Sequence, residues 1–443
     1  MSERKSDISG WLVRRATWHL WAALGAVLAA LVARTARVTS DGGMDNAIVV
    51  RAARVWWAGS SPYDDSHFLY LPSAVLAAAP QVLIPRGALS VLVPVAVTGC
   101  LVGGWACALR LHGVPLRSRF AVLGLLGLAA GFAPFAHLVL LGNWTATAVL
   151  ALPLALLLAG RGRWVAAGLV IGAAAALKPL LAPVGLLFVF AGRWRGLAAL
   201  VGVPVVASVG AALLLPDPAG FFTRTLPFLL SGDDSFVRLY EASPGAVLPR
   251  VGVPGVLAGG IGLAGAGAGL GCAWWRWRRG DGGALRLAET AVMLMLSAFL
   301  VARPSYDHYL LVVVPLVVAG LPCAGAVARG PWFWLALVPQ LPGVSWPYLE
   351  GVQRRAFRDA VTLCGMAVTL AVHCGRGGRS CWRPPPLPVP SSRAAAPSAP
   401  PAAAPLDPAV GSALGPPASS VHHPTRSAGR RASGASEPPG AGE

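Results

Sequence analysis

The feature that most constrains this chain is a series of apolar runs, each about 15–25 residues long, separated by short clusters of arginine. Runs of this length are long enough to cross the hydrocarbon core of a bilayer as helices. Few of them alternate with the two-residue period of a strand, and a helix satisfies its own backbone hydrogen bonds inside lipid. The sequence therefore predicts an all-α, polytopic membrane protein.

The charge distribution argues for membrane orientation and against a nucleic-acid partner. The formal net charge is +18, but the arginines lie between the apolar runs and in the C-terminal part of the chain. The seven cysteines lie mostly inside apolar runs and form no CxxC pair, so we expect no zinc or redox site and no cofactor. The acid pairs Asp64-Asp65 and Asp233-Asp234 are more simply exposed loop acids than metal ligands.

The arginine clusters also predict the topology. They place residues 1–16 in the cytoplasm, residues 34–72 and 216–249 in two outer loops, and a multi-span membrane domain at residues 17–374. From Gly375 onward the chain is rich in Pro, Ala, Ser and Arg, which predicts a disordered cytoplasmic tail over residues 375–443. We expect about 11–12 membrane segments. They are 17–33, 87–109, 120–141, 145–160, a pair within 163–193, 196–215, 251–274, 285–302, 309–328, 332–344 and 360–373.

The pair within 163–193 is predicted because arginines at both ends of this stretch indicate the cytoplasmic side. The proline of Lys178-Pro179 removes a backbone donor and would break the stretch into two short segments. A single tilted span is the alternative.

The first outer loop contains the first candidate site residue, Asp45. It stands where the N-cap of a helix over 46–58 is expected, so a capping role and a catalytic role both remain open. That helix is amphipathic and is expected to lie along the outer membrane surface, with Arg51 and Arg54 on a shared face. These two arginines are suited to a phosphate, although solvated surface charge is the simpler interpretation.

Two further features bring ionisable groups to the membrane region. Lys178 is, with Lys5, one of only two lysines in the chain, and an ionisable group near membrane depth costs about 2.5–3.5 kcal/mol on insertion scales. It therefore indicates a function, with snorkelling to the interface as the alternative. Arg303, Asp307 and His308 form a compact polar set that the topology places on the same side as Asp45.

Four motifs in this order resemble glycosyltransferase family 87 of the GT-C superfamily. They are Asp45 followed by GSSPYD and FLYLP, Gly142-Asn143, AAGLVIGAAAALKP, and RPSYDHYLLVVVPL, and the resemblance runs over about residues 17–347. The family includes actinobacterial polyprenyl-phosphate-mannose-dependent mannosyltransferases and a branching arabinofuranosyltransferase. In the family a Gln often follows the glycine that corresponds to Gly142, and a Trp often replaces Tyr306, so the chain departs from the pattern there.

The resemblance implies an inverting transfer on the outer face of the cell membrane, from a polyprenyl-phosphate sugar to a glycolipid or cell-envelope glycan. Asp45 matches the acid that acts as general base, and Lys178 and His308 match positions suited to the donor phosphate. The remaining candidate substrate-binding residues are Arg51, Arg54, Tyr63, Tyr70, Asn143, Arg303 and Asp307. The expected sugar is a hexosyl unit, mannosyl, with arabinofuranosyl as the near alternative.

A transporter or lipid-sugar flippase is the alternative of another class, because it too would explain Lys178 in a broken segment. Transporters usually repeat their topology. The second half of the sequence offers no partner for the break at Lys178-Pro179, and the sequence carries no nucleotide-sugar fingerprint, which favours the enzyme with a lipid-linked donor.

Overall fold

The computed structural model describes residues 10–231, 239–279, 283–343, 346, 351 and 354–375. Within these ranges the chain forms helices joined by turns, and an isolated bridge joins Arg15 to Ser118. The predicted all-α fold is therefore confirmed. Apart from Gly375, the predicted tail lies outside the described residues, as do Asp233 and Asp234.

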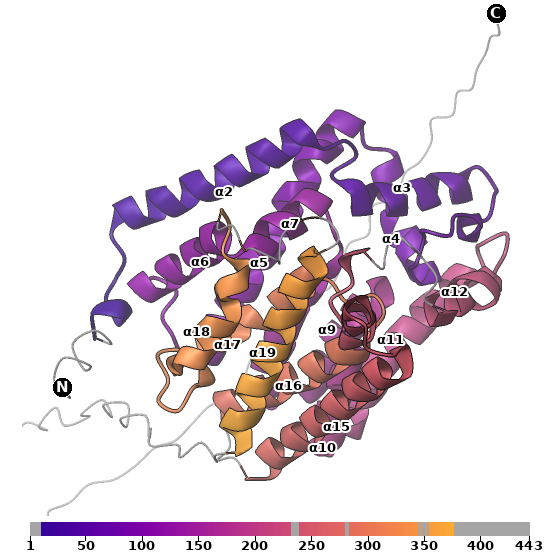
Figure 1. Ribbon diagram of the computed structural model, residues 1–443. Helices are drawn as coiled ribbons and strands as arrows, with labels where there is room; N and C mark the ends of the chain where they lie inside the picture. Colours follow the sequence, from indigo (N-terminus) through magenta and orange to yellow (C-terminus); the bar gives the residue numbers. More distant parts are fainter. Residues whose placement is uncertain are drawn as a thin grey trace, which may run out of the picture. The chain divides into compact units, whose positions relative to one another are not determined.

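The helices follow one another from α2 near the N-terminus to α19 (Figure 1). They are α2 (Trp18–Val38), α3 (Met44–Trp57), α4 (Pro72–Val82), α5 (Arg86–Leu111), α6 (Arg119–Gly131), α7 (Ala133–Leu141), α8 (Thr145–Gly160), α9 (Trp164–Leu177), α10 (Gly185–Phe190), α11 (Trp194–Ala212), α12 (Leu226–Ser231), α14 (Pro244–Val247), α15 (Gly255–Arg279), α16 (Ala284–Val301), α17 (Val314–Ala319), α18 (Pro331–Leu337) and α19 (Arg355–Gly375). The short 3₁₀ helices are η1 (Pro62–Asp64), η2 (Pro179–Val184), η4 (Leu248–Val251), η5 (Asp307–Val312), η6 (Val327–Arg329) and η7 (Val338–Gln340), and η3 (Phe221–Thr225) is a π-helix.

Among the described residues, six helices are long and apolar enough to cross a membrane, or seven if the bent pair of α6 and α7 counts as one span. Shorter apolar helices at 145–160, 164–177, 179–190 and 307–319 account for most of the other predicted segments. The predicted segment 309–328 is shorter than expected: helix α17 ends at Ala319, and Pro322, three residues later, does not allow a further helical turn.

The predicted segment 120–141 is two helices that meet at 72°. Phe132 takes an extended conformation between them, and Pro134 stands at the start of α7, where a missing N–H costs no helix hydrogen bond. The bend turns the end of α7 toward α3, which it contacts.

The break at Lys178 lies where the sequence predicts it. Helix α9 ends at Leu177, Lys178 is extended at φ −150° and ψ 119°, and the 3₁₀ helix η2 begins at Pro179. The break leaves the carbonyl of Ala176 without a helical partner, and the hydroxyl of Ser73 in α4 donates to it at 2.5 Å. The extended Lys178 is thus held at the junction of two elements.

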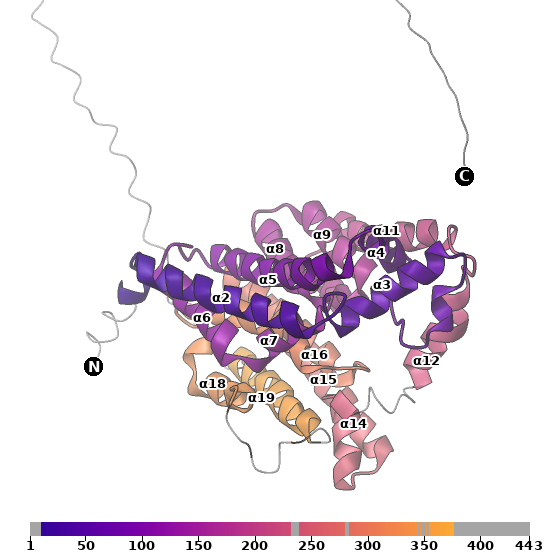
Figure 2. The same ribbon diagram turned by 90° about the horizontal axis from the view of Figure 1, so that it is seen from above.

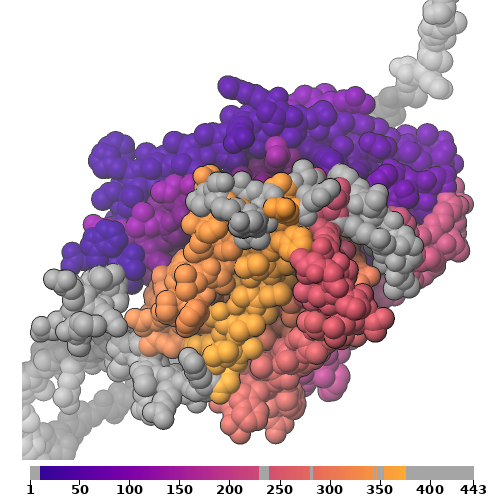
Figure 3. All heavy atoms as spheres, viewed as in Figure 1, coloured from indigo at the N-terminus to yellow at the C-terminus, as the bar shows by residue number. Residues whose placement is uncertain are grey.

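Small residues bring the principal helices into close contact. A Cβ on Gly168 of α9 would lie 2.0 Å from the carbonyl oxygen of Gly196 in α11, and one on Gly104 of α5 would lie 2.4 Å from that of Val149 in α8. Helix α2 lies beside α5, and α16 packs against α15 and α19 (Figures 1 and 2). In the space-filling view, α18 and α19 cover one face in orange, with part of the 240–280 region beside them in red (Figure 3).

Candidate active site

Helix α3 begins directly against the end of α7, and this contact positions Asp45. Gly43 has a φ of +116° and Gly142 one of +61°. A Cβ on Gly142 would lie 2.1 Å from the carbonyl oxygen of Gly42, and one on Gly43 would lie 2.5 Å from the carbonyl carbon of Leu141. Only glycines permit this backbone-to-backbone approach.

Of the two roles that the sequence left open for Asp45, the N-cap role is excluded. The N-cap is Gly43, the helix starts at Met44, and Asp45 lies within the first turn. The two glycines let the chain turn into the helix two residues earlier than the side-chain pattern suggested. The carboxylate is therefore directed to another partner across the interface.

That partner is Asn143, which joins Asp45 to Lys178. The Nδ2 of Asn143 donates to Oδ2 of Asp45 at 2.5 Å, and Nζ of Lys178 donates to Oδ1 of Asn143 at 3.3 Å. Lys178 also donates to Oγ1 of the buried Thr145 at 3.0 Å. Asn143 itself is only 3% exposed, and the backbone N–H of Thr145 fixes its amide orientation with a 2.7 Å hydrogen bond to Oδ1. One buried amide thus holds a carboxylate at one end and an ammonium group at the other.

Two tyrosines face the ammonium group of Lys178. Its Nζ lies 4.9 Å from the ring centroid of Tyr309 and 5.9 Å from that of Tyr70, distances typical of cation–π contacts. Burial, reinforced by the negative charge of Asp45, raises the pKa of Tyr70 well above its ordinary value. Its phenol therefore stays protonated and neutral at physiological pH.

A second set of hydrogen bonds supports this arrangement from α4. Nε1 of Trp144 donates to Oδ1 of Asn46 at 3.0 Å, and Nδ2 of Asn46 donates to Gln81 at 2.9 Å and to the carbonyl of Asp41 at 2.8 Å. Asn46 and Trp144 directly follow Asp45 and Asn143 in the sequence, so their hydrogen bond fixes the position of α3 relative to the turn between α7 and α8.

Asp307 is the centre of a second buried polar cluster. Its Oδ2 lies 2.6 Å from Nδ1 of His137 in α7 and accepts from Nη2 of Arg355 in α19 at 2.9 Å. Its Oδ1 accepts from the backbone N–H of His308 at 2.7 Å. A carboxylate that is 5% exposed is thereby paired with a guanidinium and an imidazole from distant helices.

His308 lies between the two clusters. Its ring is stacked on Tyr306, with centroids 5.4 Å apart, and meets the edge of Tyr309 at 5.0 Å, the same ring that faces Lys178. Its Nδ1 is 3.3 Å from Oδ1 of Asp307, and its Nε2 has no hydrogen-bond partner among the described residues although the side chain is 3% exposed. A buried ring nitrogen of this kind is suited to a ligand.

The remaining candidates have other partners. Arg51 is 3.7 Å from Asp65 with its side chain 63% exposed, and Arg54 is 3.2 Å from Asp41. Arg303 lies 3.9 Å from the buried Glu241. The buried Tyr63 donates to the carbonyl of Tyr70 at 3.5 Å, which supports the loop that contains Tyr70.

The loop acids near η1 have counterions. Arg224 forms an ion pair with Asp64 and another with Asp217, the latter at 2.9 Å. Asp65 lies 3.0 Å from His67. Within the described ranges, no group of three or more His, Cys, Asp or Glu side chains is placed to hold a metal ion.

Sequence reasoning missed His137, Thr145, Tyr309 and Arg355. His137 offers a weak signal, because it is a polar residue inside the apolar stretch AHLVLLGN. Arg355 offers none, since Arg354 and Arg358 nearby have the same chemistry and only the packing of α19 distinguishes them.

Residues 68–304, more than half of the chain, match the model of glycosyltransferase family 87. The chain belongs to this family. Tyr70, Asn143 and Lys178 lie inside the matched stretch of the family 87 model. Asp45 precedes it, and of the Asp307 cluster His137 lies inside it whereas Asp307, His308 and Arg355 follow it. The resemblance drawn from the motifs is therefore confirmed at the level of the family.

Curated relatives match a smaller part of this family 87 chain. It is 34% identical over 177 residues to the alpha-(1->3)-arabinofuranosyltransferase of Mycobacterium tuberculosis strain CDC 1551 / Oshkosh, and equally to that of strain ATCC 25618 / H37Rv. The match covers 39% of this chain and 41% of each relative, so it spans less than half of the relatives' length. No solved structure matches the chain.

Proposed function

We propose that the chain is an integral-membrane glycosyltransferase that moves a sugar from a polyprenyl-phosphate donor to a hydroxyl group of a glycolipid or cell-envelope glycan, with inversion at the anomeric carbon. The observation that carries the proposal is the contact of Asp45 and Lys178 with the two ends of the Asn143 amide in a chain of family 87. A base and a cation held a fixed distance apart suit a reaction that takes a proton at one point and releases negative charge at another.

Asp45 is the proposed general base. Its carboxylate takes the proton of the acceptor hydroxyl while that oxygen forms a bond to the anomeric carbon, and general base catalysis of this kind contributes a factor of about 10²–10⁴ in rate. The bond between the anomeric carbon and the phosphate oxygen breaks in the same step, and its electron pair leaves with the polyprenyl phosphate. Attack from the face opposite to the leaving group gives the inverted product.

Lys178 and His308 are the proposed partners of the donor phosphate. The charge on that phosphate grows as the bond breaks, and an ammonium group held by two hydrogen bonds stabilises it without reorganising. The unpartnered Nε2 of His308 is a second donor for the phosphate when protonated. Because Asn143 lies between Asp45 and Lys178, the two do not form a direct ion pair, and the carboxylate of Asp45 can still accept a proton.

The position of Lys178 within an apolar stretch supports a lipid-linked donor. Lys178 interrupts an apolar stretch at the junction of α9 and η2, so a phosphate bound there would have its isoprenoid chain next to apolar helices. The proposed location is the cell membrane, with the site on the outer face and both termini in the cytoplasm, as the arginine distribution predicts.

Two sugars are candidates. The motifs of the sequence suggest a mannosyl unit, whereas the relatives at 34% identity are arabinofuranosyltransferases, which supports arabinofuranosyl as the second candidate.

The proposal is tested with membranes that contain the full chain and radiolabelled polyprenyl-phosphate mannose or arabinofuranose. We expect a glycosidic product from one donor, and a loss of about 10²-fold or more in Asp45→Asn. Asp65→Asn is the matched control, because it removes a carboxylate from the same loop that contacts Arg51 and His67 instead. A wild-type transfer rate in Asp45→Asn would show that Asp45 is not the general base. Movement of labelled lipid across the membrane without a glycosidic product would indicate a flippase.

A further inference from the structure

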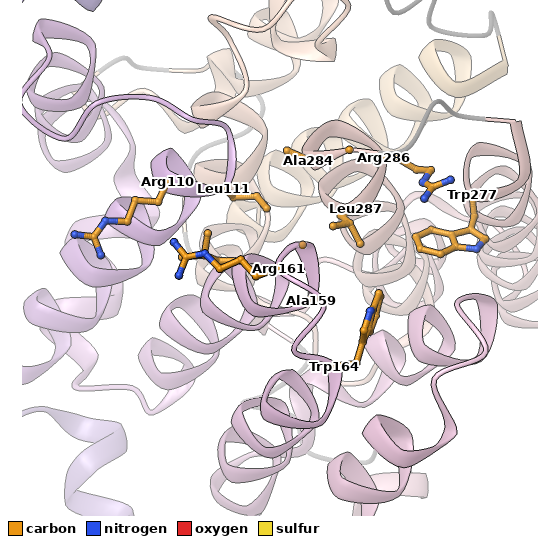
Figure 4. A pocket seen from close by; sticks show the side chains of 12 residues that line it. Arg110, Leu111, Ala159, Arg161, Trp164, Trp277, Ala284, Arg286 and Leu287 are labelled. Carbon is orange, nitrogen blue, oxygen red and sulfur yellow. The ribbon is translucent and has the colours of Figure 1, made fainter. Parts of the chain in front are cut away.

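A pocket of about 370 Å³ lies at the opposite end of α8 and α9 from the candidate active site. It is formed where α5, α8, α9, α15 and α16 meet their turns. Three arginines and two tryptophans line it, namely Arg110, Arg161, Arg286, Trp164 and Trp277 (Figure 4). This chemistry differs from that of the Asp45 site, which contains a carboxylate.

The length of α8 places the pocket relative to the membrane. Helix α8 begins at Thr145 beside Lys178 and ends at Gly160 in the pocket wall. Its 16 residues span about 24 Å, close to the roughly 30 Å hydrocarbon core of a bilayer. With the predicted topology, in which α8 crosses the membrane, the pocket and the candidate active site are placed near opposite boundaries of the membrane.

Two arginines of the pocket, Arg110 and Arg161, present positive charge to it. Figure 4 shows the guanidinium groups of Arg110 and Arg161 on one side, and that of Arg286 beside Trp277 on the other, 4.5 Å above the indole ring. Arg110 and Arg161 are exposed, and neither forms an ion pair with a carboxylate in the part of the chain that the structure describes. Two planar guanidinium groups that line the same pocket suit the oxygens of a phosphate.

Two helix N-termini add to the positive potential. Helices α9 and α16 begin at the pocket, at Trp164 and Ala284, and their N-cap residues Arg163 and Gly283 provide no side-chain cap. The first N–H groups of a helix carry partial positive charge. Tryptophan side chains at this depth are typical of the boundary between lipid and water.

Arginines at helix ends also have a simpler role. Arg110 lies in the last turn of α5 and Arg161 is the C-cap residue of α8, where cations complement the helix dipole, and both contribute to membrane orientation. Those two roles need charge alone, whereas a binding pocket also needs the guanidinium geometry. The two explanations therefore predict different behaviour when lysine replaces arginine.

We propose that this pocket binds the phosphate of an anionic glycerophospholipid from the leaflet opposite to the candidate active site. Arg110 and Arg161 contact the phosphate oxygens, and Trp164 and Trp277 pack against the glycerol region at head-group level. The site is independent of the proposed transfer reaction, so its test uses binding alone.

The test compares ligands on the full chain purified in neutral detergent. The probes are phosphatidylglycerol, phosphatidylcholine and inorganic phosphate at equal concentration, and the readouts are lipid retained in native mass spectrometry and the shift in Tm. We expect phosphatidylglycerol to be retained and to raise Tm more than the other two. An equal rise in Tm with inorganic phosphate would reject a lipid as the ligand.

Variants locate the binding. The double variant R110K/R161K keeps the positive charge but loses the planar guanidinium groups, which can donate two hydrogen bonds to one phosphate. We expect at least a 10-fold weaker apparent affinity for phosphatidylglycerol. R110Q/R161Q should weaken it further. The control R117Q/R195Q removes two exposed arginines outside the pocket and should bind as the wild type does. Wild-type affinity in R110K/R161K, or an equal loss in the control, would overturn the proposal.

Discussion

At the scale of single residues, the most informative contact is that of Arg355 with Asp307, which sequence patterns do not indicate. Arg355 of α19 reaches Asp307, which is 48 positions earlier, and lies 2.6 Å from His137, which is 218 positions earlier. Asp307 in turn holds the backbone of His308. We therefore propose that Arg355 is a positioning residue, which acts on the proposed phosphate site through Asp307.

Replacing Arg355 tests this role. In Arg355→Gln, Asp307 loses a charge-assisted hydrogen bond, and we expect a loss of about 1–3 kcal/mol in the free energy of unfolding. We also expect a higher KM for the donor with a smaller change in kcat, because His308 is displaced. Arg354→Gln, one position earlier and exposed, is the control.

The double variant Asp307→Asn with Arg355→Gln distinguishes pairing from packing. Neutralising both partners removes the uncompensated buried charge, so stability should recover relative to Arg355→Gln alone. Additive losses in unfolding free energy would show that the two side chains do not act as a pair.

At the scale of elements, the site depends on the docking of α3 against the end of α7. Gly142 has a positive φ, and its Cα faces the carbonyl oxygen of Gly42. Gly59 also has a positive φ, of +81°, but a Cβ there would meet no atom within 4 Å. Comparing alanine variants of these two glycines therefore separates the cost of a positive φ from the cost of a steric clash.

We expect Gly59→Ala to cost roughly 1 kcal/mol from the unfavourable φ alone. Gly142→Ala should cost about 1–3 kcal/mol more, because α3 must move away from α7, and the transfer rate should fall with it. The measurements are Tm in detergent and the rate of sugar transfer. Equal stability of the two variants would mean that the contact between α3 and α7 is looser than the structure shows.

Other elements follow directly from local sequence. Pro179 predicts the end of α9, and the apolar runs predict the long helices within a few residues. The bend of 72° between α6 and α7 was not predicted, because Pro134 near the start of a helix and Pro94 inside α5 are not distinguished by residue type. Packing decides which proline ends a helix.

At the scale of the whole molecule, sequence reasoning singles out those candidate residues that stand out locally. Asp45 is an acid after an apolar run, and Lys178 is a rare lysine inside one. Thr145 and His137 join the clusters through contacts between distant segments, which no local pattern encodes. The N-cap alternative for Asp45 is excluded for the converse reason, since the tertiary contact of the glycines changed where the helix begins.

The predicted orientation in the membrane has its own test. Single cysteines replace Ser60, in the loop after α3, and Pro115, in the turn between α5 and α6, in a variant without native cysteines; both positions are exposed. We expect an impermeant maleimide to label the Ser60 position in intact cells and the Pro115 position only after permeabilisation. The reverse labelling pattern would place the candidate active site on the cytoplasmic side.

The central claim is that Asp45 and Lys178 act as one site through Asn143. The most direct measurement is kcat/KM for transfer by Asp45→Asn, Lys178→Met and the double variant, with expression and Tm matched. Because groups that act as a unit give non-additive losses, we expect the double variant to be about as slow as the slower single variant. Losses that multiply, or a single variant with wild-type kcat/KM, would contradict the account.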